Sequence, residues 1–151
     1  MYVPVYDLQL EYKSLKNSID RAVQDVLESG VYVLGAQLKE FEKEFAEFCG
    51  SRYVVGVNSG TAAIQLALRA AGVSTGDEVI TAPNTDISTA SAVSHCGAKV
   101  VFADVDQCTL TINPMEIEHR ITSRTKAILP VHLFGQIADM SAIRAIADKH
   151  D

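Results

Sequence analysis

Apolar residues recur every three or four positions through the first fifty residues, which is the spacing of amphipathic helices. This pattern predicts helices over Tyr12–Ser29 and about Gln37–Phe48, and the glycines that follow, Gly30 and Gly50, are typical helix ends. From residue 53 onward, short apolar runs alternate with helical segments. The runs predict strands at Tyr53–Val57, Glu78–Ala82, Lys99–Ala103 and Lys126–His132, with helices at Thr61–Ala71, Thr85–Cys96, Pro114–Ile121 and Asp139–His150.

Strands that are apolar almost throughout, separated by helices, indicate an α/β fold whose sheet is largely parallel and covered on both faces. Such sheets bind ligands beyond the carboxyl ends of their strands, close to helix N-termini. Three turns occupy that position in this sequence, and they begin at Asn58, Pro83 and His132. We therefore look for candidate site residues in these turns.

The turn Asn58-Ser59-Gly60-Thr61 lies directly between a predicted strand and a predicted helix. The first N–H groups of a helix have no partner inside it and carry partial positive charge. Gly60 lets an anion approach the backbone, Thr61 and Ala62 offer N–H groups, and the Ser59 hydroxyl adds a donor, so the turn can hold a phosphate. The simpler interpretation is that Ser59 or Thr61 only caps the helix. No G-K-S/T and no G-x-G-x-x-G follows, so a nucleotide P-loop and a dinucleotide fingerprint are both absent.

The other two turns each contain one candidate residue. Thr85 is a plausible N-cap, and Asp86 would then lie in the first turn, where negative charge is favoured; its functional interpretation is a polar group lining a pocket above the sheet. His132 leaves its strand near the carboxyl end, where it is either a ligand-facing group or a structural, hydrogen-bonded histidine. Asp104 and Asp106 resemble a metal pair, but no further carboxylates follow at ligand spacing, so a solvated loop is expected instead.

Composition narrows the class of protein. The 151 residues carry a net charge of −6 without clustered Lys and Arg, which argues against nucleic acid as a partner. No apolar run of about 18 residues occurs, so no membrane span is expected, and the N-terminus is unlike a signal peptide. The odd number of widely spaced cysteines, Cys49, Cys96 and Cys108, favours reduced thiols in a cytoplasmic protein over a disulfide framework or zinc site.

Taken together, these segments resemble the DegT/DnrJ/StrS family of sugar aminotransferases. The resemblance runs along nearly the whole chain, and its segments occur in the family's order and spacing. They are VPVYDLQLEY, VLGAQLKEFEKEFAEFCG, VNSGTAAIQLALRAAGVSTGDEVITAPNT, GAKVVFADVD and INPMEIEHRITSRTKAILPVHLFGQIADM.

The resemblance implies that residues 1–151 are the N-terminal part of a three-layer type I aminotransferase large domain with a mixed, mostly parallel sheet. It also implies a pyridoxal-phosphate cofactor, a homodimer, a nucleotide-linked keto-deoxysugar as substrate and glutamate as amino donor. It places Gly60, Thr61 and Ala62 in the family's phosphate-binding turn and Asp86 beside the cofactor. From their places in the first and third turns, Ser59 and His132 are further candidate cofactor-binding residues. Family members usually carry an aromatic residue at the position of Asp86, where it stacks on the cofactor ring, and an aspartate cannot stack.

The resemblance also implies that the family's Schiff-base lysine lies beyond Asp151, so we expect no catalytic residue within this chain. None of its lysines stands in a matching motif, and we expect the chain alone to be inactive in amino transfer. We also expect an unpaired sheet edge with exposed apolar surface after the helix at 139–150, and dimerisation or aggregation as a result.

Three alternatives to an aminotransferase can be compared. A sugar dehydratase of the same family differs at the position of the lysine, which this chain does not contain. A non-catalytic, truncated homologue would bind a partner or act in regulation. A nicotinamide-dependent dehydrogenase shares the alternating pattern, but the missing G-x-G-x-x-G argues against it.

Overall fold

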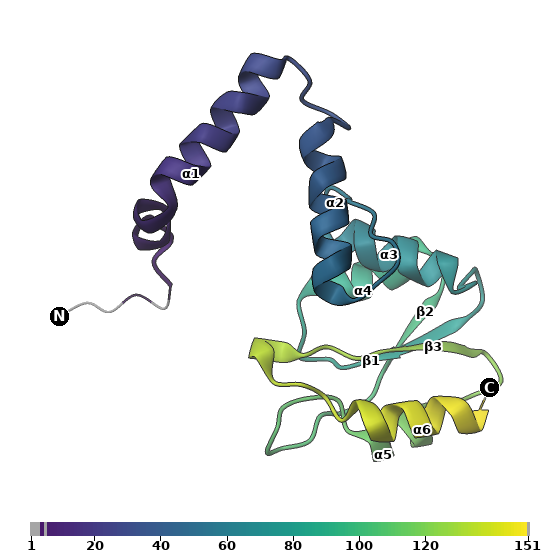
Figure 1. Cartoon of the computed structure of the whole chain (residues 1–151). Coiled ribbons are helices and arrows are strands. Elements are labelled where there is room, and N and C mark those ends of the chain that lie inside the picture. Colours follow the sequence, from purple (N-terminus) through teal and green to yellow (C-terminus); the bar gives the residue numbers. More distant parts are fainter. Residues whose placement is uncertain (1–3, 5, 151) are drawn as a thin grey trace. The chain divides into compact units, whose positions relative to one another are not determined.

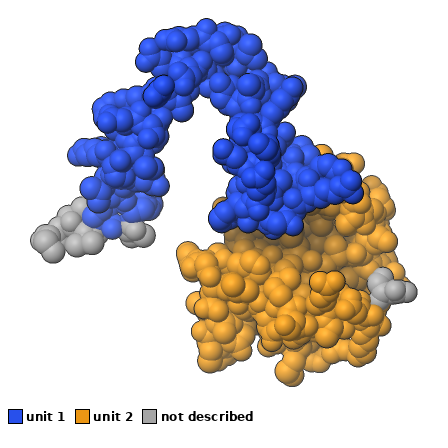
Figure 2. Space-filling view, in the orientation of Figure 1, with its two compact units in different colours: residues 1–56 blue, residues 57–151 orange. Residues whose placement is uncertain are grey.

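The computed structural model describes residue 4 and residues 6–150, which form two compact units, 1–56 and 57–151 (Figures 1 and 2). The first unit contains helices α1 (Leu8–Ser29) and α2 (Ala36–Cys49). Helix α1 begins four residues earlier than the hydrophobic spacing predicts, because the Asp7 side chain accepts a hydrogen bond from the Leu10 amide at 2.9 Å. Both helices end where predicted, at Gly30 and Gly50, whose φ angles of 66° and 63° favour glycine.

The second unit is a three-layer α/β structure, as the alternating pattern predicts. Its helices are α3 (Gly60–Ala70), α4 (Ile87–His95), α5 (Pro114–Arg120) and α6 (Met140–His150), and a 3-10 turn, η1, spans Leu133–Gly135. Its strands are β1 (Glu78–Thr81), β2 (Lys99–Phe102) and β3 (Thr125–Leu129). The sheet has the order β2-β1-β3, and both strand pairs are parallel.

Alternate residues of the strands face two separate hydrophobic clusters. Ile80 belongs to the cluster that contains Ile117 of α5 and Ile143 of α6. Its neighbour Val79 belongs to the cluster that contains Leu68 of α3 and Val93 of α4. Both faces of the sheet are therefore covered by helices, as expected for a parallel sheet (Figure 1).

The predicted strand at Tyr53–Val57 is wrong. Among the described residues, this segment pairs with no other strand, and a strand requires a hydrogen-bonded neighbour. The Gly56 amide instead donates a hydrogen bond of 2.8 Å to the Glu42 carboxylate of α2. The segment is therefore held by a side chain within its own unit.

The strand that begins at residue 125 also ends earlier than the sequence predicts. It stops at Leu129 rather than at His132, because Pro130 has no N–H to donate to a ladder. Strand β3 pairs with β1 on one side. Within residues 4 and 6–150, no strand pairs with its other side, so the sheet has an unpaired edge there, as expected.

Candidate site at the carboxyl ends of the strands

Helix α3 begins at the turn that the sequence singles out as a phosphate site. Ser59 is the N-cap residue, and its hydroxyl oxygen accepts a hydrogen bond of 3.1 Å from the Ala62 amide. The first bond of the helix runs from the Ala63 amide to the Ser59 carbonyl at 3.0 Å. The capping interpretation is therefore realised, and it occupies the Ala62 amide. The amides of Gly60 and Thr61 precede the first helical bond and have no acceptor within the helix.

Space in front of Gly60 is open. An added Cβ would meet no heavy atom of the chain within 4 Å, and Gly60 does not adopt a positive φ. Neither backbone conformation nor crowding within the described chain requires glycine there. A glycine at this position would, however, let a ligand approach the backbone closely.

The second turn differs from its predicted capping arrangement. Asp86, rather than Thr85, is the N-cap of α4, and its carboxylate accepts a hydrogen bond of 2.8 Å from the Ser88 amide. Hydrogen bonds from the Ser88 side chain and amide lower the pKa of Asp86, so its carboxylate is ionised at neutral pH. The Thr85 hydroxyl instead lies 3.1 Å from that of Thr89.

Asn84 is a residue of this turn to which the sequence assigned no role. Its side-chain amide donates a hydrogen bond of 2.9 Å to the carbonyl of Leu110, in the loop that follows β2. The contact joins the loops that leave two neighbouring strands, and so positions the start of α4. An asparagine in a turn is too common for its sequence alone to indicate this contact.

His132 lies three residues after β3 and immediately before η1. Its Nδ1 accepts a hydrogen bond of 3.2 Å from the Ala138 amide, which fixes the ring against the following loop. Nδ1 of His132 therefore has the structural, hydrogen-bonded role that the sequence left open. Nε2 is left as the ring atom that can contact a ligand.

Asp86 and His132 lie at the same end of the sheet, where the strands have their carboxyl ends, because they follow the neighbouring parallel strands β1 and β3. The Ser59 turn lies toward the same edge. Arg69 and Gln65 of α3 both donate hydrogen bonds to the carbonyl of His95, at the end of α4, so the C-terminal ends of the two helices lie together. Since α3 and α4 pack along each other, their N-termini share the opposite end.

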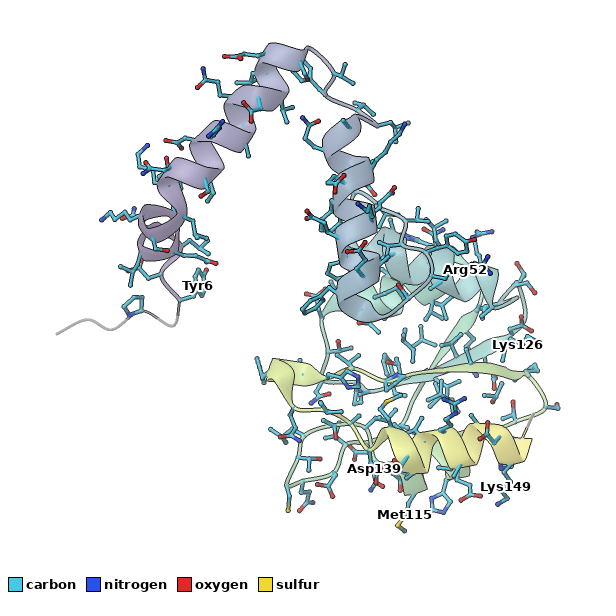
Figure 3. The ribbon with its side chains drawn as sticks, in the orientation of Figure 1. Tyr6, Arg52, Met115, Lys126, Asp139 and Lys149 are labelled. Carbon is cyan, nitrogen blue, oxygen red and sulfur yellow. The ribbon has the colours of Figure 1, made fainter. Side chains whose placement is uncertain are left out.

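The lysines of the second unit lie elsewhere. Lys99 begins β2 and lies 3.5 Å from Glu78, at the amino ends of the strands. Lys126 is the second residue of β3, at the opposite end of that strand from the His132 turn, and Lys149 is on α6, paired with Glu118 (Figure 3). None of these three lysines belongs to the turns at the carboxyl edge.

The described residues show no metal cluster and no disulfide. Asp104 and Asp106 accept hydrogen bonds from amides in their own loop, and no group of three or more potential metal ligands occurs among residues 4 and 6–150. All three cysteines are free. Across the described part of the chain, every helix is too short or too polar to cross a membrane.

The sequence is similar to characterised proteins along almost its whole length. A sequence profile of the DegT/DnrJ/EryC1/StrS aminotransferase family matches residues 13–151. The chain is 45% identical over 150 residues to a pleiotropic regulatory protein from Geobacillus stearothermophilus. It is 47% identical over 148 residues to a dTDP-3-amino-3,4,6-trideoxy-alpha-D-glucose transaminase from Streptomyces venezuelae. These alignments cover 99% and 98% of this chain but 40% and 39% of the two relatives.

Solved structures are also similar to this chain over almost all of its length. The S. venezuelae protein DesV, in complex with a ketimine intermediate, has a TM-score of 0.94 and 47% identity, over 98% of this chain and 40% of that one. NtdA from Bacillus subtilis, with bound cofactor PMP, has a TM-score of 0.88 and 39% identity, over 91% of this chain and 32% of that one. The chain thus shares its fold with a part of these larger proteins.

Proposed function

This chain belongs to the DegT/DnrJ/EryC1/StrS aminotransferase family, and from this premise we propose that it forms the cofactor-phosphate part of a pyridoxal-phosphate-dependent sugar aminotransferase. The whole protein would move an amino group from glutamate to a nucleotide-linked keto-deoxysugar. This proposal is supported by the S. venezuelae relative, which is named as a transaminase of a dTDP-linked amino sugar. We propose that residues 1–151 belong to one large domain of that protein.

The observation that carries this proposal is the Ser59 turn. The amides of Gly60 and Thr61 have no acceptor within α3, and the space in front of Gly60 is open. A phosphate at this helix N-terminus would gain two backbone donors and the favourable helix dipole. The residues present therefore fit the phosphate group of the cofactor.

Asp86 and His132 would also face the bound cofactor, from the carboxyl ends of the strands. Asp86 would present an ionised carboxylate, held in place by Ser88, and His132 would present Nε2 while Ala138 fixes its Nδ1. When bound, pyridoxal phosphate supplies the carbonyl group that accepts and releases the amino group. This chain's residues would hold and orient it, and Asp86 could not stack on its ring.

The lysine that holds the cofactor covalently would come from outside this chain. The lysines of the second unit lie away from the carboxyl edge, with Lys99 paired to Glu78 and Lys149 to Glu118. We therefore infer that the 151-residue chain alone has no transaminase activity. Amino transfer from glutamate by the purified chain would contradict this.

We also propose a homodimer that works in the cytoplasm. Three free cysteines suit a reducing compartment. Phe41, Phe45 and Phe48 form an exposed aromatic row along α2, with adjacent ring centroids 5.5 and 6.1 Å apart, which is surface that a subunit contact can bury. Sedimentation at several concentrations tests the association.

The cofactor proposal is tested by comparing two ligands that differ in one group. The chain is titrated with pyridoxal phosphate and with pyridoxal, which lacks the phosphate, and binding is followed by changes in absorbance. Pyridoxal phosphate is expected to bind at least about tenfold more tightly, since one charge-assisted contact set contributes about 1.5–3 kcal/mol. Equal affinity for the two would contradict the phosphate site.

A second candidate function is regulation without catalysis, favoured by the name of the Geobacillus stearothermophilus relative. It is distinguished by the same titration. A chain that binds neither ligand, while its fold is intact by circular dichroism, would support this candidate over the cofactor proposal.

A further inference from the structure

Phe134, the middle residue of the η1 turn, combines an exposed ring with a strained backbone. It is 94% exposed, and its φ angle of 54° lies in the left-handed region, where a bulky side chain is unfavourable. Glycine would adopt this conformation without strain, and a polar side chain would suit the exposure. Neither the backbone nor packing within the described residues therefore accounts for a phenylalanine at this position.

The hydrogen bonds of the turn hold Phe134 in this conformation. The amides of Gly135 and Gln136 donate hydrogen bonds of 3.1 and 3.0 Å to the carbonyls of His132 and Leu133. Backbone strain that the surrounding structure maintains is typical of functional sites, where it fixes a side chain for its task. The exposed ring thus has a fixed place, as the side chain of a binding site requires.

The η1 turn lies at the same end of the sheet as the candidate site. It follows the carboxyl end of β3, and β3 is the neighbour of β1, which leads into the turn of Asp86 (Figure 1). Phe134 is two residues from His132, a separation that spans at most about 7 Å along the chain. The backbone of Phe134 therefore lies within a small ligand's length of His132.

Few aromatic side chains are available at this end of the sheet. From residue 57 onward the sequence contains two phenylalanines, Phe102 and Phe134, and no tyrosine or tryptophan. Phe102 is the last residue of the outer strand β2 and belongs to its ladder with β1. Of the two, only Phe134 lies in a turn that follows the carboxyl end of a strand. The ionised carboxylate of Asp86 offers no apolar face to a flat ring.

We propose that Phe134 binds the pyridine ring of the cofactor and supplies the aromatic contact that the Asp86 carboxylate cannot make. Aromatic rings attract one another in offset-stacked or edge-to-face arrangements, so such a contact favours a flat aromatic ligand. The Ser59 turn would hold the phosphate of this molecule, and Phe134 would contact its ring. The assignment rests on the proposed function, because it requires the phosphate site. The strain is then retained because it keeps the ring out of the core and accessible to the ligand.

The contact is tested by NMR with two ligands that share a phosphate group. Pyridoxamine phosphate carries the aromatic ring and has no aldehyde to react with surface lysines, whereas glycerol phosphate has no ring. The chain is labelled on its five phenylalanines, and the Phe134 signal is assigned by its loss in Phe134→Leu. Pyridoxamine phosphate is expected to shift the Phe134 signal through its ring current and to leave that of Phe102 in place, whereas glycerol phosphate leaves both in place.

Substitutions at Phe134 separate the ring from the volume of the side chain, and calorimetric titrations measure the affinities. Phe134→Tyr keeps the ring and should bind pyridoxamine phosphate as tightly as the unchanged chain. Phe134→Leu keeps an apolar side chain without a ring, and should bind this ligand about fivefold more weakly, as expected for the loss of one aromatic pair. Its affinity for glycerol phosphate should be unchanged. Phe102→Leu is the matched control and should leave both affinities as they are.

A glycine variant tests the strain itself. Phe134→Gly should lose the same affinity as Phe134→Leu, while its melting temperature stays the same or rises, because glycine adopts the left-handed conformation without strain. A lower melting temperature would show that packing explains Phe134, which overturns the proposal.

The ligand titrations distinguish this contact from the proposed function. If both ligands bind but the Phe134 signal does not respond, or if the leucine and tyrosine variants bind equally well, the ring contact is overturned and the phosphate site stands. If neither ligand binds, the phosphate site has failed and the ring contact fails with it.

Discussion

The Arg124 guanidinium donates a hydrogen bond of 2.7 Å to the carboxylate of Glu78, which lies 46 positions earlier in the chain. The Thr122 hydroxyl donates to the other oxygen at 2.7 Å, and the Lys99 ammonium lies 3.5 Å away. Glu78 is only 2% exposed, and these donors keep its buried charge compensated. The carboxylate therefore ties the start of β1 to the turn before β3 and to the start of β2.

Replacing this carboxylate by an amide should destabilise the second unit. In Glu78→Gln, one of the two oxygens becomes an NH2 group that faces existing donors, so we expect the melting temperature to fall by several degrees. Asp148→Asn, the same chemical change at an exposed position of α6, serves as the control and should leave the melting temperature unchanged. Equal effects of the two substitutions would show that the Glu78 contacts do not stabilise the fold.

The contribution of Glu78 should also depend on pH. The hydrogen bond from Thr122, followed by the hydrogen bond and charge of Arg124, lowers the pKa of Glu78 below its usual 4.5. Because the folded pKa is the lower one, the stabilisation is fully present above the unfolded pKa and is lost as pH falls through the folded pKa. Urea unfolding of the unchanged chain and Glu78→Gln should show their difference shrinking in acid, and a constant difference would contradict this explanation.

Ile117 provides a test of the packing between α5 and the sheet. It is 0% exposed within the cluster around Ile80, so Ile117→Ala should cost about 2–5 kcal/mol in the free energy of unfolding. Ile87, which is 76% exposed, is the matched control, and Ile87→Ala should change this free energy by less than about 0.5 kcal/mol. Denaturant titrations of the two variants measure the difference, and a small effect at Ile117 would place it outside the core.

Ser59 should stabilise the beginning of α3 as its cap. Ser59→Ala removes the acceptor of the Ala62 amide and should lower the free energy of unfolding by about 1 kcal/mol. Ser59→Thr keeps a hydroxyl acceptor and should lose less. The order of the two variants in urea unfolding checks the role, and an alanine variant as stable as the unchanged chain would rule out a stabilising cap.

Gly60 allows the binding role of this turn to be separated from its folding role. An added Cβ meets no atom within 4 Å, so Gly60→Ala should leave the stability of the chain unchanged or slightly higher. The same Cβ would stand where the phosphate approaches the backbone, so affinity for pyridoxal phosphate should fall at least about tenfold. The two quantities come from urea unfolding and absorbance titration, and a variant with unchanged affinity would argue against anion binding at this turn.

Several features of the fold were predictable because they depend on neighbouring residues. The ends of α1 and α2 follow from Gly30 and Gly50, and the start of α5 follows from Pro114 at the first helical position. The alternation of apolar runs and helices likewise indicated a parallel sheet covered on both faces. The fold class was therefore readable along the chain.

Other features were not predictable because they depend on residues far apart in the sequence. The contact of Asn84 with Leu110 results from how the loops meet above the sheet. The cap at Asp86 rather than Thr85 is a local contact with Ser88, but aspartate and threonine are both common N-caps, so the residue types did not choose between them. The candidate cofactor residues remain predictions; they are Ser59, Gly60, Thr61, Ala62, Asp86 and His132. For them, the tertiary structure adds which amides and ring atoms are open to a ligand.

The sequence by itself determined the family, the order of the helices and strands from residue 60 onward and the turns to search, because periodicity, caps and motifs are encoded between near neighbours. Only the tertiary structure decided that Tyr53–Val57 does not form a strand, that Glu78 is buried among Thr122 and Arg124, and which edge of β3 is open. Strand pairing and the compensation of a buried charge require partners that the fold brings together across tens of residues. No local pattern specifies which partners meet.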